Sequence, residues 1–278
     1  MKLHLPVDHV SDTAYLVALL RSYESERPDA KFRDPFAALL AEPKTAVLES
    51  KLSWKESGTW LMTARTHLLD RHIERLARQG SVQAVVNLAA GLDTRAYRLS
   101  LPENLAWIEA DFPELLDYKK ARLSHQLPKC SLQNVGIDLG DDEERHQFFA
   151  RLAQRQGKVL VLTEGLLPYL PEESVITLAA ELRNLPSASY WLMDVATPAL
   201  IRSFHDQMPN SEPSQGVAFK FGPAEGPAYF ERLGWRIEAF DSFVDHSECL
   251  ERPVPSVLRG SPGALNLSGI ALLSKRSS

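Results

Sequence analysis

The chain is poor in cysteine and has no excess of positive charge. Its 278 residues include two cysteines, Cys130 and Cys249, which lie far apart and form no Cys-x-x-Cys pair. This argues against a disulfide-framed scaffold, a zinc finger and a thioredoxin-type pair, and it favours a reducing cytoplasm. With 31 Lys and Arg against 36 Asp and Glu, the formal net charge is -5, so no sequence-wide basic field is available to bind duplex nucleic acid.

Long apolar runs are missing as well. No segment approaches the roughly 20 apolar residues that a membrane span requires, and Pro6 and Asp8 interrupt the N-terminus before the apolar stretch of a signal peptide can form. Neither export nor anchoring is therefore expected, and we predict a cytoplasmic protein. A hydrophobic content of 44% over this length is sufficient for a full core.

From about residue 82 onward, short apolar runs alternate with longer amphipathic stretches. The apolar runs, in chain order, are VQAVVNLA, LAWIEAD, LQNVGIDL, KVLVLTEG, SYWLMDV, WRIEAF and LNLSGIALLS. Helix-like stretches begin at Pro113, Asp141 and Pro171, where a proline or an acidic run suits a first helical turn. The alternation predicts an α/β fold with a parallel sheet covered by helices on both faces. No evident helix separates the last two runs, which allows an antiparallel ribbon.

Before residue 82 the pattern is helical, with helices predicted over about 12–23, 34–41 and 59–78. We interpret residues 1–80 as an N-terminal helical cap packed on a core of residues 81–278. An insert rich in Pro, Gly and Ser is expected at about 207–226, ahead of a predicted helix with the sequence AYFERLG.

Polar residues follow the first two strands, where an open parallel sheet binds its ligands. Ala89 and Gly91 lie in a turn of small residues that lets the backbone approach a ligand, although an ordinary tight turn would have the same composition. Asp111 follows Gly91 at the separation of about 20 residues at which an acidic side chain binds a ribose diol. Together they favour a nucleoside ligand, and the alternative is a solvated acidic loop.

The third and fourth strands also end in polar residues. Asp138 and Leu139 suit an exocyclic amine and the face of a base, although Asp138 equally fits a helix N-cap. Glu164 brings a carboxylate into the crevice, unless it turns outward to water. Behind it, the apolar loop of residues 166–170 contains Tyr169 and is suited to wall a small-molecule pocket.

Arg65 is the most informative residue outside the sheet. On the helix predicted over 59–78 it shares a face with Leu61, Leu68 and Leu69, so it projects from the apolar stripe. A structural role would place Arg65 at the edge of that stripe or pair it with an acidic residue of the chain. In a functional role, it would bind a ligand carboxylate through two N–H groups.

These features require a ligand with a ribose, a base and a carboxylate. A dinucleotide loop favours Gly-x-Gly-x-x-Gly, whereas this chain has Ala89 and Thr94 at two of the three glycine positions. S-adenosylmethionine is a better match, with Glu164 beside its ammonium or sulfonium charge. The histidines are scattered and no paired-carboxylate cluster accompanies them, so no metal is expected.

Five strings of the sequence resemble the leucine carboxyl methyltransferase family, including its bacterial polyketide O-methyltransferase branch. They are ESERPDAKFRDPFA, MTARTHLLD, VVNLAAGLDTRAYRL, IEADFPELLDYKKARL and LTEGLLPYLP, and the resemblance covers most of residues 21–183. It implies a class I S-adenosylmethionine-dependent methyltransferase fold. Such a fold has a doubly wound, mostly parallel seven-stranded sheet with an antiparallel last strand, here preceded by the helical cap.

The resemblance also implies the roles of individual residues. The cofactor-binding positions would be Arg65 for the methionine carboxylate, Ala89 and Gly91 in the turn, Asp111 for the ribose, Asp138 and Leu139 for the adenine, and Glu164 for the methionyl end. Tyr169 matches a tyrosine close to the transferred methyl group, which makes Arg65 and Tyr169 the catalytic candidates. Arg21 matches loosely and is a further candidate for the cofactor. Ala89 departs from the family, which commonly has glycine there.

We therefore predict an S-adenosylmethionine-dependent O-methyltransferase that releases S-adenosylhomocysteine. No compelling base is present, which favours a carboxylate over a hydroxyl acceptor, because a carboxylic acid is already ionised at neutral pH. The expected acceptor is a small metabolite such as a polyketide, with no nucleic-acid or membrane partner. The alternatives are a catalytically silent cofactor-binding regulator and a protein C-terminal carboxyl methyltransferase.

Overall fold

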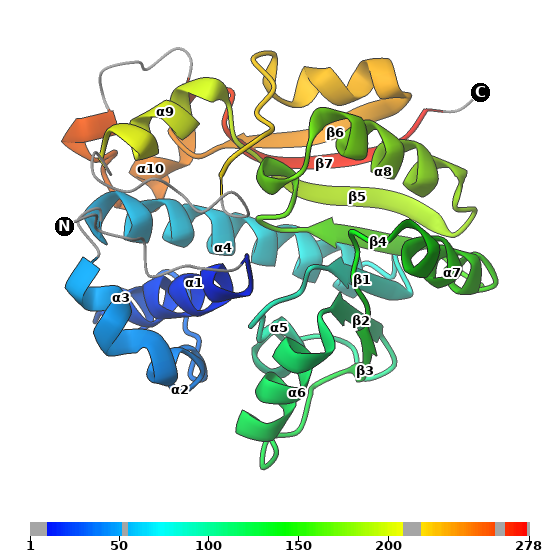
Figure 1. The fold of residues 1–278 in the computed structure, drawn as a ribbon, viewed down its shortest axis with the longest axis horizontal. Helices are drawn as coiled ribbons and strands as arrows, with labels where there is room; N and C mark the ends of the chain where they lie inside the picture. The colour runs from blue at the N-terminus through cyan, green and yellow to red at the C-terminus, as the bar shows by residue number, and fades with distance from the viewer. Residues whose placement is uncertain (1–9, 52–54, 208–217, 259–264, 277–278) are drawn as a thin grey trace.

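A seven-stranded sheet forms the centre of the protein (Figure 1). The computed structural model describes residues 10–51, 55–207, 218–258 and 265–276. Five strands are parallel: β1 (Ala84–Leu88), β2 (Ala106–Asp111), β3 (Ser131–Gly136), β4 (Val159–Thr163) and β5 (Ala188–Val195). Strand β7 (Gly269–Lys275) lies between β5 and β6 (Trp235–Ser242) and is antiparallel to both. The predicted doubly wound sheet with an antiparallel last strand is confirmed.

The order of the strands places a crevice at the centre of the sheet. The order is β3-β2-β1-β4-β5-β7-β6. Strands β1 to β3 extend from the centre to one edge of the sheet, and the strands from β4 onward extend to the other edge. Leu88, the last residue of β1, is paired with Ala110 on β2 and Thr163 on β4. The carboxyl ends of these three strands therefore lie level, at the switch point where open α/β sheets bind ligands.

Alternate residues of the strands build two apolar layers. Leu160 and Leu162 of β4 pack on the side of α4 (Lys55–Arg78), in a cluster with Leu68 and Leu69. The intervening Val161 packs with α7 (Asp142–Ala153) and α8 (Glu172–Asn184) on the other face. The continuous apolar run of β4 follows from burial on both faces.

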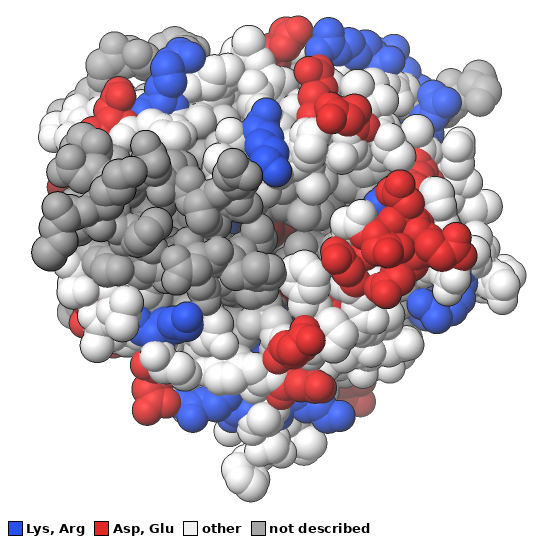
Figure 2. Space-filling model, viewed as in Figure 1, with Lys and Arg blue, Asp and Glu red and all other residues white. Residues whose placement is uncertain are grey.

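The predicted helix starts are close to the observed ones. Helix α6 (Pro113–Arg122) begins at Pro113, and α8 follows Pro171. Asp141 caps α7, since its Oδ1 accepts a hydrogen bond from the Glu144 N–H at 3.0 Å. The acidic side chains of residues 141–144 gather in a patch over this helix start, which complements the helix dipole (Figure 2). Helices α5 (Arg95–Arg98), α9 (Pro198–Asp206) and α10 (Asp245–Cys249) were not predicted.

The predicted helix AYFERLG is a 3₁₀ helix, η3 (Gly226–Leu233). Its buried residues repeat every three positions, Gly226 with Tyr229 and Pro227 with Phe230, which matches a three-residue turn. The ring of Phe230 lies 5.3 Å from that of Trp191 in the core.

The N-terminal region contains α1 (Val10–Ser25), α2 (Ala37–Ala41), a short 3₁₀ helix η1 (Glu42–Lys44) and α3 (Thr45–Lys51) before α4; α3 was not predicted. Leu19, Leu40 and Leu48 of these helices pack with Leu115 of α6 and with Leu92. Two further 3₁₀ helices are η2 (Leu167–Tyr169) and η4 (Ser256–Leu258). The division near residue 80 and the insert at 207–226 stay predictions, and residues 208–217 of that insert lie outside the described part. In the described residues, no helix has the length and apolar character to cross a membrane.

Candidate functional site

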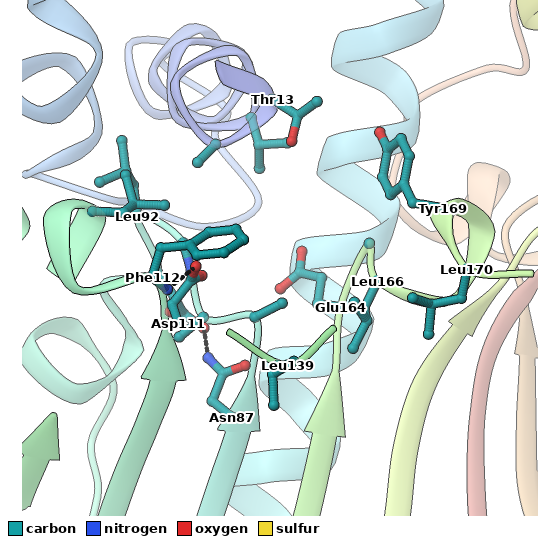
Figure 3. A pocket seen from close by; sticks show the side chains of 18 of the residues that line it. Thr13, Asn87, Leu92, Asp111, Phe112, Leu139, Glu164, Leu166, Tyr169 and Leu170 are labelled. Carbon is teal, nitrogen blue, oxygen red and sulfur yellow. Dashed lines mark hydrogen bonds between the residues drawn. The ribbon is translucent and has the colours of Figure 1, made fainter. Parts of the chain in front are cut away.

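A cavity of about 420 Å³ lies beyond the carboxyl ends of β1, β2 and β4. Figure 3 shows Asp111 and Phe112 on one side of it, Glu164 and Leu166 in the middle, and Tyr169 with Leu170 on the other side. Every residue that the sequence placed in a site lines it: Arg65, Ala89, Gly91, Asp111, Asp138, Leu139, Glu164 and Tyr169. Their proximity is thus a property of the structure, whereas their roles toward a cofactor stay predictions.

The turn after β1 has an unusual backbone. Ala89 and Gly91 both adopt positive φ, at 55° and 52°. A Cβ atom on Gly91 would lie 3.3 Å from the Ala14 Cβ, so α1 covers this turn closely. A left-handed conformation costs a residue with a side chain about 1–2 kcal/mol, and Ala89 carries this strain where glycine would not.

We expect Ala89→Gly to stabilise the protein. The relief of about 1–2 kcal/mol of strain exceeds the roughly 0.5–1 kcal/mol that glycine loses through its greater freedom when unfolded, so the free energy of unfolding should rise by about 0.5–1 kcal/mol. Urea unfolding measures this. The control is Ala90→Gly in the same turn, where φ is not positive and the same loss of a methyl group should destabilise. Changes of the same sign in both variants would refute the strain at Ala89.

Asp111 holds the turn from the neighbouring strand. Its Oδ2 accepts the Gly91 N–H at 2.6 Å and its Oδ1 accepts the Phe112 N–H at 2.7 Å. Asp111 is only 7% exposed, and this burial raises the pKa of its carboxyl group despite the two backbone donors. The alternative of a solvated acidic loop is therefore wrong. Each oxygen keeps a lone pair with which to accept a ligand hydroxyl.

The residues after β3 form the outer wall of the cavity. Asp138 is exposed and its Oδ1 accepts the N–H of Gly140 at 2.8 Å, so it closes a turn. The alternative of a helix N-cap is wrong for Asp138, because Asp141 is the residue that caps α7. Leu139 is half-buried and packs against the apolar layer beneath it.

Arg65 of α4 joins two acidic residues at the middle of the cavity. Its Nε donates to Glu164 Oε1 at 2.9 Å, and its Nη1 lies 3.4 Å from Asp194 Oδ2. Arg65 is 8% exposed, so the internal pairing considered for it is present while its guanidinium also lines the cavity. Asp194 Oδ1 accepts the Gly165 N–H at 2.7 Å. A Cβ on Gly165 would lie 3.3 Å from Arg65 Nη1 at a φ of 62°, so glycine suits this position.

A second guanidinium group, that of Arg95, also pairs with Glu164. Arg95 Nη1 lies 2.6 Å from Glu164 Oε2 and 2.7 Å from Asp93 Oδ2, and Arg95 Nε lies 2.6 Å from Asp70 Oδ1. Arg95 is 2% exposed. Burial alone would raise the pKa of Glu164, but the Arg95 and Arg65 charges hold it below its ordinary value. Glu164 therefore enters the cavity as a fixed carboxylate rather than turning out to water.

Sequence reasoning missed Asp194 and Arg95 of this network and assigned no role to Asn87. Asn87 and Asp194 lie near the carboxyl ends of β1 and β5. Glu164 was selected because it lies at the end of a strand, and the same reasoning applies to these two residues. Asn87 Nδ2 donates to Asp93 Oδ2 at 2.8 Å. Arg95 carries no comparable signal, because nothing in its local sequence marks it as buried.

Arg21 is also in the cavity wall, as the loose sequence match allowed. Its Nε donates to Asp34 Oδ2 at 2.9 Å and its Nη2 donates to the Leu92 carbonyl at 2.7 Å. These two contacts tie α1 to the loop before α2 and to the turn after β1. Whether Arg21 reaches a cofactor stays a prediction.

Tyr169 closes the far side of the cavity. Its ring lies 5.2 Å from the ring of Phe219, and it extends into the cavity on the side of Thr13 (Figure 3). Burial raises the pKa of Tyr169 to about 12. The phenol is therefore protonated at neutral pH, so its hydroxyl is a potential hydrogen-bond donor and not a base. Across the described part of the chain, no three or more His, Cys, Asp and Glu side chains are grouped to hold a metal ion.

Comparison with known proteins identifies relatives over most of the chain. A family profile described as leucine carboxyl methyltransferase matches residues 14–183. A candidate S-adenosyl-L-methionine-dependent methyltransferase of Mycolicibacterium paratuberculosis is 32% identical over 90% of this chain and 86% of its own length. Another, from Saccharopolyspora erythraea, is 35% identical over 71% of this chain and 70% of its own.

Solved structures share the fold. A DUF574 family protein from Streptomyces avermitilis superposes with a TM-score of 0.58 at 14% identity, over 93% of this chain and 97% of its own. A candidate methyltransferase from Thermobifida fusca has a TM-score of 0.51 at 16% identity, over 98% of this chain and 96% of its own.

Proposed function

The chain belongs to the leucine carboxyl methyltransferase family, and from this premise we propose that it transfers the methyl group of S-adenosylmethionine to an oxygen of a small molecule. The observation that supports the proposal is that all predicted site residues line the same cavity, with guanidinium and carboxylate groups at its middle. A nucleoside with a zwitterionic tail and a positive sulfonium is the ligand that these groups complement.

The described residues fit this cofactor from one end of the cavity to the other. Asp111 has lone pairs for the ribose hydroxyls, and Leu139 is an apolar neighbour for the adenine. Arg65 keeps further N–H groups for the methionine carboxylate beyond those that face Glu164 and Asp194. Glu164 carries the negative charge that suits the ammonium group or the sulfonium.

Bound S-adenosylmethionine supplies an electrophilic methyl group, and the chain supplies position and an environment shielded from water. Arg65 and Glu164 would hold the methionyl end, and Asp111 would hold the ribose. Tyr169 borders the acceptor end, where its protonated hydroxyl donates a hydrogen bond to the acceptor. No residue of the chain would have to form a covalent intermediate, because the acceptor would take the methyl group directly from the cofactor.

A carboxylate is the favoured acceptor and a hydroxyl the second candidate. A carboxylic acid with a pKa of about 4 is ionised at neutral pH and needs no base, whereas a phenol near 10 must lose its proton. The phenol of Tyr169, with its pKa at about 12, does not serve as that base.

The test transfers a labelled methyl group from S-adenosylmethionine into extracts of small metabolites and treats the product with mild alkali. We expect alkali to release the label as methanol, as it does from an ester. Label retained after alkali means an ether and a hydroxyl acceptor, and label in the protein fraction means a protein acceptor. If S-adenosylhomocysteine binds but no label is transferred to any extract, the protein is a silent cofactor-binding regulator and the proposal is wrong.

A further inference from the structure

Lys220 is a cation at the cavity with no acidic partner among the residues that the structure describes. It lines the same cavity as Arg65 and Arg21 and is exposed. The two arginines differ from it, since Arg65 faces Glu164 and Asp194, and Arg21 faces Asp34. The ammonium group of Lys220 is therefore the positive charge of this wall that no described carboxylate pairs with.

The backbone fixes Lys220 beside Tyr169. The N–H groups of Lys220 and Phe221 both donate to the Pro168 carbonyl, at 2.6 and 3.1 Å. On the preceding residue, the ring of Phe219 packs against that of Tyr169. The backbone of Lys220 therefore lies at the Tyr169 end of the cavity. Asp111 lies at the other end (Figure 3).

Two leucines give this end of the cavity an apolar wall. Leu166 and Leu170 are half-buried, and both line the cavity. An ammonium group and a phenolic O–H above an apolar wall recognise an anionic group attached to an apolar body.

We infer that Lys220 determines the choice of acceptor: with Tyr169 it forms a subsite for the anionic group of an apolar organic acid. This rests on the proposed function, because it specifies the substrate of the same site. One carboxylate oxygen pairs with Lys220 while the other attacks the methyl carbon; the C–O bond forms, the C–S bond breaks and its electron pair stays on sulfur. The resulting ester is neutral, so the attraction to Lys220 is lost and the product is released.

The test measures binding of small acids and their amides to the protein saturated with S-adenosylhomocysteine, by calorimetry at low salt. The probes are phenylacetate against phenylacetamide, and octanoate against octanamide. We expect the acid to bind about fivefold more tightly than its amide in at least one pair, as a partly exposed charge pair provides. Lys220→Met should abolish this preference and Lys220→Arg should keep it. Lys158→Met, at an exposed lysine outside the cavity, is the matched control and should change nothing.

Two outcomes overturn the inference and leave the proposed function intact: no preference for the acid in either pair, or a preference that survives in Lys220→Met. A third is a loss of S-adenosylhomocysteine affinity in Lys220→Met, which would place the lysine at the cofactor. A wild-type protein that fails to bind S-adenosylhomocysteine would instead contradict the proposed function itself.

Discussion

Arg95→Met is expected to lower the free energy of unfolding by about 3–5 kcal/mol, the cost of leaving buried charges without their partner. Arg95 is almost completely buried and contacts carboxylate oxygens of Asp70, Asp93 and Glu164 at 2.6–2.7 Å. Methionine fills a similar volume but leaves these carboxylates facing one another. Urea unfolding followed by circular dichroism measures the loss.

The control for Arg95 is Arg27→Met. Arg27 forms ion pairs with Asp29 and Glu24, but its side chain is 48% exposed, so its loss should cost less than about 1 kcal/mol. The pH dependence provides a second readout. Without Arg95, the folded-state pKa of Glu164 and Asp93 rises, so their protonation should recover part of the lost stability as pH falls toward 5. A loss in Arg95→Met no larger than that in Arg27→Met would show that the buried network contributes little.

Arg65→Ala is expected to weaken the binding of S-adenosylhomocysteine by about 10- to 150-fold, which corresponds to the roughly 1.5–3 kcal/mol of a hydrogen bond to a charged group. The reason is that Arg65 would bind the carboxylate of the amino-acid tail. Titration calorimetry measures the dissociation constant. The matched control is Arg71→Ala, an exposed arginine on the same helix outside the cavity, which should leave it unchanged.

A second ligand separates a lost contact from a damaged site. 5′-Methylthioadenosine has the nucleoside and the thioether but no amino-acid carboxylate, so Arg65→Ala should bind it as the wild type does. Glu164 is expected to keep its place in this variant, because Arg95 still contacts its Oε2. Unchanged affinity for S-adenosylhomocysteine would rule out Arg65 as the carboxylate site, and weakened binding of both ligands would indicate a general disturbance of the cavity.

The sequence was sufficient for the sheet and for the residues at its edge. Apolar runs such as that of β4 are local signals of burial on both faces of a sheet. The carboxyl ends of neighbouring parallel strands lie at the same edge of the sheet, however far apart the strands are in the sequence. This is why Asp111 and Glu164, 53 residues apart in the chain (164 − 111), line one cavity.

The ionic network could not be predicted in the same way. Arg95 and Asp93 follow a small-residue turn and resemble a solvated loop. The contacts that Arg95 makes when buried are with Asp70 of α4 and with Glu164 after β4, both distant in the sequence. The left-handed backbone of Ala89 could not be predicted either, because an alanine in the sequence does not indicate a positive φ. The 3₁₀ form of η3 is set by the core into which Tyr229 and Phe230 insert, which is a property of tertiary structure.

The position of β7 constrains the order of assembly. Among the described strands, β6 pairs with β7 alone, and β7 follows it in the chain after α10 and η4. During synthesis β6 therefore leaves the ribosome before its neighbour exists and has no template on the growing sheet. Because long-range pairing of this kind forms late, the five parallel strands and their crevice are the part of the protein that can assemble first, with β6 and β7 joining the β5 edge together.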